Sequence, residues 1–219
     1  MAETDTNVLL SELYRFLGCS LAYPRALWLD RPYLDGLAGL LDSLECGEEL
    51  TEIRNQSTDL PELLESLQIE YTRLFINSVP ETIAPPYGSV YRRGEGMLNS
   101  ISTEKTRQFY RQQGFDLASS TDLADYLPLQ LEFLALLLEE GRQDTAEEFL
   151  IVHFRPWFAV FRDRVRQGAL LPFYRILVEL IDFFTKEEEE YGYQGDQTEI
   201  PADRLAGRGF GASGPTGPG

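Results

Sequence analysis

The sequence is poor in residues that bind metals or form disulfides. Its 219 residues include two cysteines, Cys19 and Cys46, and one histidine, His153. The cysteines do not form a Cys-x-x-Cys pair, and a single histidine does not complete a zinc site with them. A helical di-iron site would need two Glu-x-x-His pairs. We therefore expect no metal and no cofactor. Because Cys19 falls inside an apolar helical stretch, we expect its side chain to be buried.

Basic residues are scarce relative to acidic ones. Nineteen lysines and arginines stand against 36 aspartates and glutamates, which gives a formal net charge of −17. A surface this negative repels phosphate backbones and anionic lipid headgroups, so we expect neither nucleic-acid binding nor direct membrane insertion. It suits a basic partner, such as an arginine-bearing peptide, but it is also typical of a well-solubilised protein.

Long apolar runs and targeting signals are missing as well. No apolar run approaches the ~20 residues that a membrane-spanning helix needs. The first five residues, Met-Ala-Glu-Thr-Asp, are acidic and lack the basic start of a signal peptide. The sequence therefore predicts a cytoplasmic protein.

Recognisable catalytic patterns are also absent from the sequence. It contains neither the Gly-x-x-x-x-Gly-Lys-Ser/Thr phosphate loop nor a Gly-x-Gly-x-x-Gly after a strand. His153 has no serine or cysteine partner at a known catalytic spacing. We therefore predict that the protein is not an enzyme. Two alternatives stay open: a small helical hydrolase, in which His153 would line a pocket near a nucleophile, and a purely structural helical subunit.

Apolar residues recur at three- and four-residue steps along most of the chain, which predicts an all-α fold. We expect a single bundle-like domain of about eight helices. The stretch from Asp125 to Glu140 is apolar nearly all round, which is typical of a central, buried helix. The predicted helices lie near residues 10–21, 30–44, 60–75, 102–113, 125–140, 143–154, 157–165 and 171–186.

Composition indicates how the chain is organised beyond its helices. We expect an all-helical domain over residues 1–190 and a flexible, glycine- and proline-rich tail over 191–219. Residues 119–122, Ser-Ser-Thr-Asp, predict a hinge between subdomains 1–118 and 123–190. A hinge of this kind allows domain exchange between chains, so both a monomer and a domain-exchanged dimer remain open.

The helical pattern stops between Ile76 and Ser100, which predicts a long ordered loop, and loops of this length are often functional. Pro85-Pro86 stiffens its backbone towards an extended conformation, and Gly88 permits a turn. The loop would therefore present Tyr87 and Tyr91 on a rigid backbone. Two interpretations remain equal at this point: the tyrosines bind a peptide at low entropic cost, or they pin the loop to the helices.

Three segments of the sequence resemble one known family. They are Glu-Tyr-Thr-Arg-Leu-Phe at residues 70–75 with Pro-Pro-Tyr-Gly-Ser-Val-Tyr at 85–91, Phe-Leu-Ile-Val-His-Phe-Arg-Pro-Trp at 149–157, and Phe-Tyr-Arg at 173–175. In order and spacing they resemble the TorD/DmsD/NarJ family of redox-enzyme maturation chaperones, over about residues 9–186. The resemblance implies an all-α fold and a cytoplasmic chaperone that binds the twin-arginine leader or the apo form of a molybdopterin-dependent oxidoreductase catalytic subunit. It would hold this client until cofactor insertion and export or assembly.

The resemblance also implies which residues form the peptide groove. Apolar and aromatic groups would take the hydrophobic region of the leader, and Asp125 would pair with its arginines. In one branch of the family the client has no cleaved leader and the chaperone grips the apoenzyme itself. The implied groove residues are Tyr71, Leu74, Phe75, Pro86, Tyr87, Ser89, Tyr91, Asp125 and Tyr126.

One departure from the family pattern lies just before the central helix. The family commonly has Asp-Asp-His there, whereas this chain has Ala124-Asp125-Tyr126. The missing histidine weakens any transfer of the guanine-nucleotide binding reported for some members. Asp125 remains as the single acidic anchor at this position.

Overall fold

The computed structural model describes residues 2–56, 59–79, 81–92, 96–119 and 122–186. These residues form helices and no named strand, so the all-α prediction is confirmed. The proposed tail at 191–219 and the middle of the proposed hinge, residues 120–121, lie outside the described residues. The α-helices are α1 (Ala2–Ser20), α2 (Arg31–Ser43), α3 (Gly47–Gln56), α4 (Leu60–Tyr71), α5 (Ile101–Gln112), α6 (Leu127–Glu139), α7 (Gln143–Phe149), α8 (Arg155–Gly168) and α9 (Pro172–Thr185).

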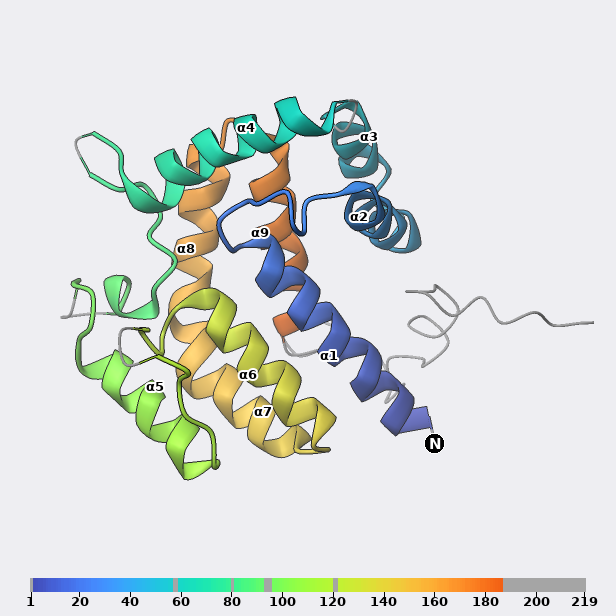
Figure 1. Ribbon diagram of the computed structural model, residues 1–219. Helices are drawn as coiled ribbons and strands as arrows, with labels where there is room; N and C mark the ends of the chain where they lie inside the picture. Colours follow the sequence, from blue (N-terminus) through green and yellow to red (C-terminus); the bar gives the residue numbers. More distant parts are fainter. Residues whose placement is uncertain (1, 57–58, 80, 93–95, 120–121, 187–219) are drawn as a thin grey trace, which may run out of the picture.

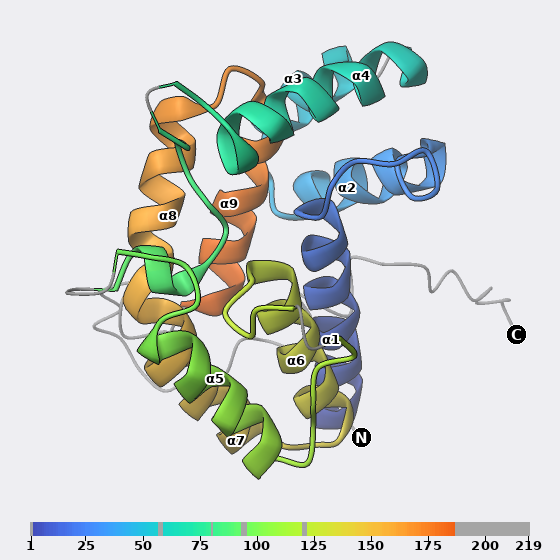
Figure 2. The same cartoon turned by 60° about the vertical axis from the view of Figure 1, so that its left-hand side comes forward.

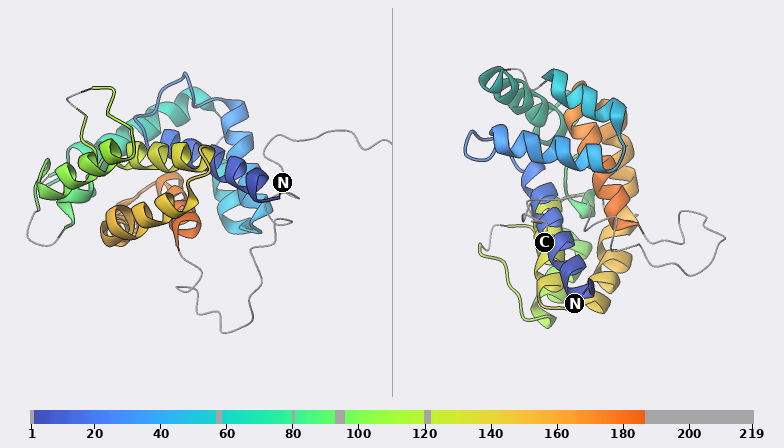
Figure 3. Two further views of the ribbon diagram at one scale, coloured as in Figure 1. Left: turned by 90° about the horizontal axis from the view of Figure 1, so that it is seen from below. Right: turned by 90° about the vertical axis from the view of Figure 1, so that its right-hand side faces the viewer.

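Helix α6 lies at the centre of the arrangement, as its apolar sequence predicts. It packs along α1 and contacts α7, and α8 and α9 lie side by side behind it (Figure 1). Seen from below, α1 and α6 lie on one side and α8 and α9 on the other (Figure 3). Helices α2, α3 and α4 close one end of the molecule (Figure 1).

A glycine lets α1 approach α6 closely. A Cβ added at Gly18 would lie 3.3 Å from the carbonyl oxygen of Pro128 and 3.4 Å from the Cβ of Leu131. At the next turns of the same interface, Arg15 of α1 pairs with Glu132 and Glu139 of α6. The contact between α1 and α6 is therefore closely packed at Gly18, and it carries ion pairs at its solvent-exposed edge, at Arg15.

The acidic residue of the 70–75 segment is structural. Glu70 is buried, and its carboxylate accepts hydrogen bonds from Arg73, with N···O distances of 2.8 Å, and from the backbone N–H of Leu170 at 2.6 Å. Arg73 also donates to the carbonyl of Gly168. This pair therefore fixes the connection between α8 and α9 to the end of α4.

Two π-helical turns, Thr72–Ile76 and Leu150–Phe154, extend α4 and precede α8. Pro156, which separates the helices expected at residues 143–154 and 157–165, occupies the first turn of α8, directly after the second π-turn. A proline has no N–H for the carbonyl four residues earlier, that of Val152. Arg92 donates to this carbonyl instead, at 2.7 Å, and to that of His153 at 3.1 Å. The wider turn is thus stabilised by a side chain from the long loop.

Two expectations were wrong. Helix α3 had no counterpart among the predicted helices, because its only buried residues are Leu50 and Ile53 and two apolar residues give little periodic signal. Cys19 is exposed rather than buried, because it lies on the face of α1 opposite the buried residues Leu17 and Leu21. Among the described residues, no helix is both long and apolar enough to cross a membrane.

Candidate functional site

Residues 85–91, which we call the strap, pair with the segment just before α6. Tyr87 and Tyr126 form an isolated antiparallel bridge. The N–H of Gly88 donates to the carbonyl of Asp125 at 3.0 Å, and the N–H of Leu127 donates to that of Pro86 at 2.9 Å. Figure 2 shows the chain after α4 descending past α8 to this point. The fold therefore brings together the two segments that the resemblance singles out.

The inner side of the strap is held by Asp125 and is closed to solvent. The Asp125 side chain is 1% exposed, and its Oδ2 accepts a hydrogen bond from the Ser89 N–H at 2.7 Å. Ser89 is fully buried. In this conformation the strap therefore covers the carboxylate that we expected to meet a leader arginine.

Tyr91 pins the strap to α8. Its ring stacks on Trp157, with centroids 5.9 Å apart, and its hydroxyl donates to the carbonyl of Pro85 at 2.8 Å. The guanidinium of Arg164 lies 5.1 Å from the Tyr91 ring. For Tyr91 the geometry therefore fits the interpretation in which a tyrosine anchors the loop to the helices.

Four tyrosines form a continuous row that begins on the outer side of the strap. Tyr87 stacks on Tyr126 with centroids 5.2 Å apart, the hydroxyls of Tyr126 and Tyr71 are 3.3 Å apart, and the Tyr71 ring meets the edge of Tyr23 at 5.4 Å. We call Tyr87, Tyr126, Tyr71 and Tyr23 the aromatic strip. Tyr87 and Tyr126 are half-buried and Tyr23 is 39% exposed, so the strip reaches solvent at both ends. Tyr23 was not among the predicted site residues.

The structure brings the nine predicted residues into one region but exposes few of them. Leu74 and Phe75 belong to the hydrophobic core, and Leu74 anchors the chain before the strap by accepting the N–H of Ala84 at 2.8 Å. Tyr87, Tyr91 and Tyr126 are half-buried. The remaining predicted residues, Tyr71, Pro86, Ser89 and Asp125, are buried.

The phenols of Tyr71, Tyr87 and Tyr126 remain protonated at neutral pH. Burial raises the pKa of Tyr71, Tyr87 and Tyr126 above the usual value. For Tyr87, the neighbouring Tyr126 and the carboxylates of Asp125 and Asp122 raise the pKa further. These three tyrosines therefore offer neutral hydroxyl groups together with apolar ring surface.

Asp122 is a second carboxylate near the strip that the sequence did not single out. Its side chain is half-buried, and its charge is felt at Tyr87. The backbone carbonyl of Asp122 accepts a hydrogen bond from Arg107 at 3.0 Å, which ties this turn to α5. The sequence signal was its position three residues before Asp125, on the approach to α6.

His153 lies between aromatic rings and not at the strip. It is 9% exposed, its Nδ1 is 3.2 Å from the hydroxyl of the buried Thr106, and its ring stacks on Phe149 with centroids 5.3 Å apart. Burial, with the nearby charges of Arg92 and Lys105, lowers its pKa to about 4. This environment does not fit the hydrolase alternative, which needs His153 to line a pocket.

Comparison with known proteins gives a family, named relatives and a solved fold. The model of the nitrate reductase delta subunit family matches residues 40–163. Three curated relatives, each called Tat proofreading chaperone DmsD, come from Salmonella paratyphi A, Salmonella typhi and Salmonella typhimurium. Each is 34% identical over 119 residues, which cover 53% of this chain and 57% of the relative. The matched part thus spans little more than half of those relatives.

A solved structure from Archaeoglobus fulgidus, that of a candidate redox enzyme maturation protein, is similar in fold. It superposes with a TM-score of 0.56 over 80% of this chain and 94% of its own, at 24% sequence identity. At that identity the likeness supports the helical fold alone.

Proposed function

The chain belongs to the nitrate reductase delta subunit family, the family of TorD, DmsD and NarJ, and from this premise we propose that it is a chaperone for a molybdenum-cofactor oxidoreductase. It binds the twin-arginine leader of the catalytic subunit, or its apo form, in the cytoplasm. It holds the client until the cofactor is inserted and export or assembly follows. The action is sequestration, with no covalent step.

The observation that carries this proposal is the aromatic strip, which begins at Tyr87 on the strap. The strap is fixed by two backbone hydrogen bonds to the segment before α6 and by the stacking of Tyr91 on Trp157. Rings held on a rigid backbone lose little conformational entropy when a peptide binds. Tyrosine contributes apolar area and a hydroxyl donor at once, so the strip suits the apolar part of a leader.

Carboxylates at the strap end of the strip provide partners for leader arginines. Asp122 is half-buried and near enough to Tyr87 for its charge to raise the pKa of that tyrosine, so we expect its carboxylate to accept a guanidinium. Asp125 would do so only after the strap moves, since the strap covers it. The net charge of −17 favours the approach of a basic peptide and makes that approach sensitive to salt.

The test is a calorimetric titration with a synthetic leader that carries an arginine pair followed by an apolar stretch. We expect Tyr87→Ala to weaken binding at least tenfold, because central aromatic contacts usually dominate such interfaces. Asp122→Asn should weaken it about fivefold, which corresponds to a partly exposed charge pair of ~1 kcal/mol. Raising the salt from 50 to 300 mM should weaken binding to the wild-type protein and change binding to Asp122→Asn less.

Asp35→Asn is the matched control. Asp35 is exposed on α2 and is not part of the strip, so this substitution removes the same charge at another place. We expect it to bind like the wild-type protein. If Tyr87→Ala combined with Tyr126→Ala binds the leader as tightly as the wild-type protein does, the aromatic strip is not part of the binding site. A client without a cleaved leader would bind through its own N-terminal segment, and the same variants test that mode with that segment as the probe.

A further inference from the structure

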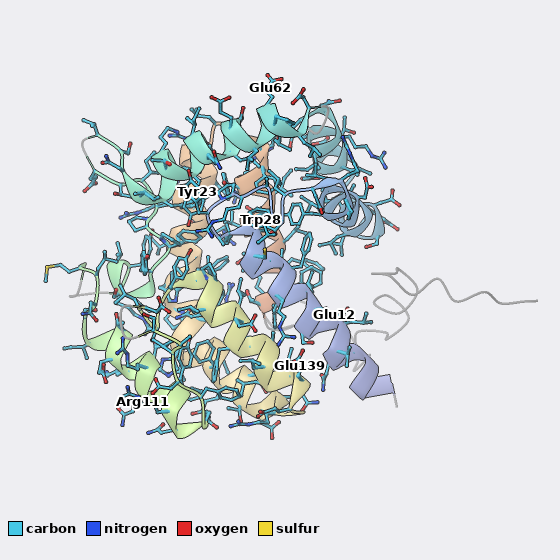
Figure 4. The ribbon with its side chains drawn as sticks, in the orientation of Figure 1. Glu12, Tyr23, Trp28, Glu62, Arg111 and Glu139 are labelled. Atoms are coloured by element: carbon cyan, nitrogen blue, oxygen red, sulfur yellow. The ribbon has the colours of Figure 1, made fainter. Side chains whose placement is uncertain are left out.

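The connection between α1 and α2, residues 21–30, continues the aromatic strip past Tyr23. The indole N–H of Trp28 donates to the carbonyl of Tyr23 at 3.4 Å. Leu27, next to Trp28, is 90% exposed, and Trp28 itself is half-buried. Figure 4 shows Tyr23 and Trp28 on the same side of the molecule, in front of the helices. The row of tyrosine contacts therefore joins the strap to this connection, with the buried Tyr71 between its two partly exposed ends.

This connection is held in a defined shape. Gln68 of α4 donates to the carbonyl of Pro24 at 2.9 Å. The N–H groups of Trp28 and Leu29 both donate to the carbonyl of Arg25, at 3.1 and 3.0 Å, and Leu29 is buried. The exposed apolar residues are thus presented by an ordered backbone, which limits the entropic cost of binding to them.

The two ends of this extended surface differ in charge. At the strap end stand the carboxylates of Asp122 and Asp125, both close enough to Tyr87 to raise its pKa. At the other end the exposed Arg25 and Asp30 carry opposite charges, beside the apolar side chains of Tyr23 and Leu27. A guanidinium is therefore attracted more strongly to the first end than to the second, where the two charges offset each other. The surface therefore has a direction.

We propose that residues 21–30 form a second subsite that takes the apolar stretch of the leader, and that the leader binds with its arginines at the strap and its apolar stretch at Tyr23 and Leu27. This inference rests on the proposed function, because it concerns the same peptide. It adds that residues 21–30 contact the leader, and it gives the direction in which the leader lies on the surface.

The test compares two synthetic peptides, one with the arginine pair and the apolar stretch and one that ends after the arginine pair. We expect Tyr23→Ser combined with Leu27→Ser to weaken binding of the longer peptide about tenfold, or ~1.4 kcal/mol. Binding of the shorter peptide should change less than twofold. Val8→Ser combined with Val160→Ser is the matched control, since both valines are about half exposed on α1 and α8, at 46% and 47%.

The outcomes separate this inference from the proposed function. If the wild-type protein binds neither peptide, the proposed function fails. If the longer peptide binds the wild-type protein and the Tyr23/Leu27 variant equally well, or if both peptides weaken together, only the second subsite is overturned.

A cross-linking experiment on the wild-type protein tests the direction without any substitution in the chain. A benzophenone group at the apolar end of the longer peptide should label residues 21–30. The same group beside the arginine pair should label residues 85–91 or 122–127. The reverse pattern of labelling would contradict the proposed polarity.

Discussion

Gly88 stands where the strap passes closest to α8. A Cβ added there would lie 2.9 Å from Nε1 of Trp157 and 3.0 Å from its Cδ1, and Trp157 is fully buried. Neither partner moves freely, because Trp157 also packs against Phe158 and Phe161. The glycine is therefore required by a close approach and not by the turn alone.

We accordingly predict that Gly88→Ala lowers the free energy of unfolding by about 1–3 kcal/mol, the usual cost of overpacking a core. Urea unfolding followed by tryptophan fluorescence measures it. Leader binding should weaken as well, because the added methyl group displaces the strap. Unchanged stability would show that the strap does not press on Trp157 in solution.

His153 makes stability depend on pH. Its pKa is about 4 in the folded chain and ~6.5 in an unfolded one, so the unfolded chain binds more protons between these values. The free energy of unfolding therefore falls as the pH is lowered from 6.5 towards 4, and the contribution is fully present only above 6.5. His153→Gln, which stays neutral, removes this dependence.

Urea unfolding of the wild-type protein and His153→Gln at pH 7.5, 5.5 and 4.5 checks this prediction. The stability of the wild-type protein relative to the variant should fall by roughly 2 kcal/mol between pH 7.5 and 4.5. A difference that is constant across this range would place His153 in solvent and reopen the hydrolase alternative.

At the scale of elements, periodicity predicted the helices that bury several residues and missed α3, which buries two. Helices such as α6 and α9 bury many residues at regular steps, whereas α3 buries two. The sequence predicted an interruption between residues 154 and 157 but not the π-turn before α8. Its actual form depends on Arg92, which comes from a loop about 60 residues earlier in the chain, and sequence periodicity carries no information on such a contact.

Gly39 offers a prediction at the same scale. It lies inside α2, and a Cβ added there would meet no atom within 4 Å. Glycine is about 0.8–1.0 kcal/mol less favourable than alanine in a helix. Gly39→Ala should therefore raise the free energy of unfolding by about 0.5–1 kcal/mol, measured by urea unfolding. Gly39→Ala and Gly88→Ala add the same methyl group, but we expect opposite changes in the free energy of unfolding. A loss of stability in Gly39→Ala would mean that α2 contacts another group at this position.

At the scale of the whole molecule, the sequence predicted the all-α class and, through the resemblance, the two segments that meet at the strap. It did not predict that Asp125 would be covered by the strap, because that burial arises from pairing across 36 residues of chain. Nor did it single out Tyr23, whose place in the strip depends on how the α1–α2 connection folds back onto α4. Both depend on tertiary contacts that local patterns do not encode.

We propose that this chain holds a molybdenum-cofactor oxidoreductase through the aromatic strip. The most direct measurement is recovery of bound proteins from the native host with a tagged full-length chain, identified by mass spectrometry, for the wild-type protein and for Tyr87→Ala combined with Tyr126→Ala. We predict that the wild-type protein recovers an oxidoreductase catalytic subunit with its N-terminal segment intact and that the variant recovers little of it. Equal recovery by both proteins, or recovery of no such subunit, would contradict the account.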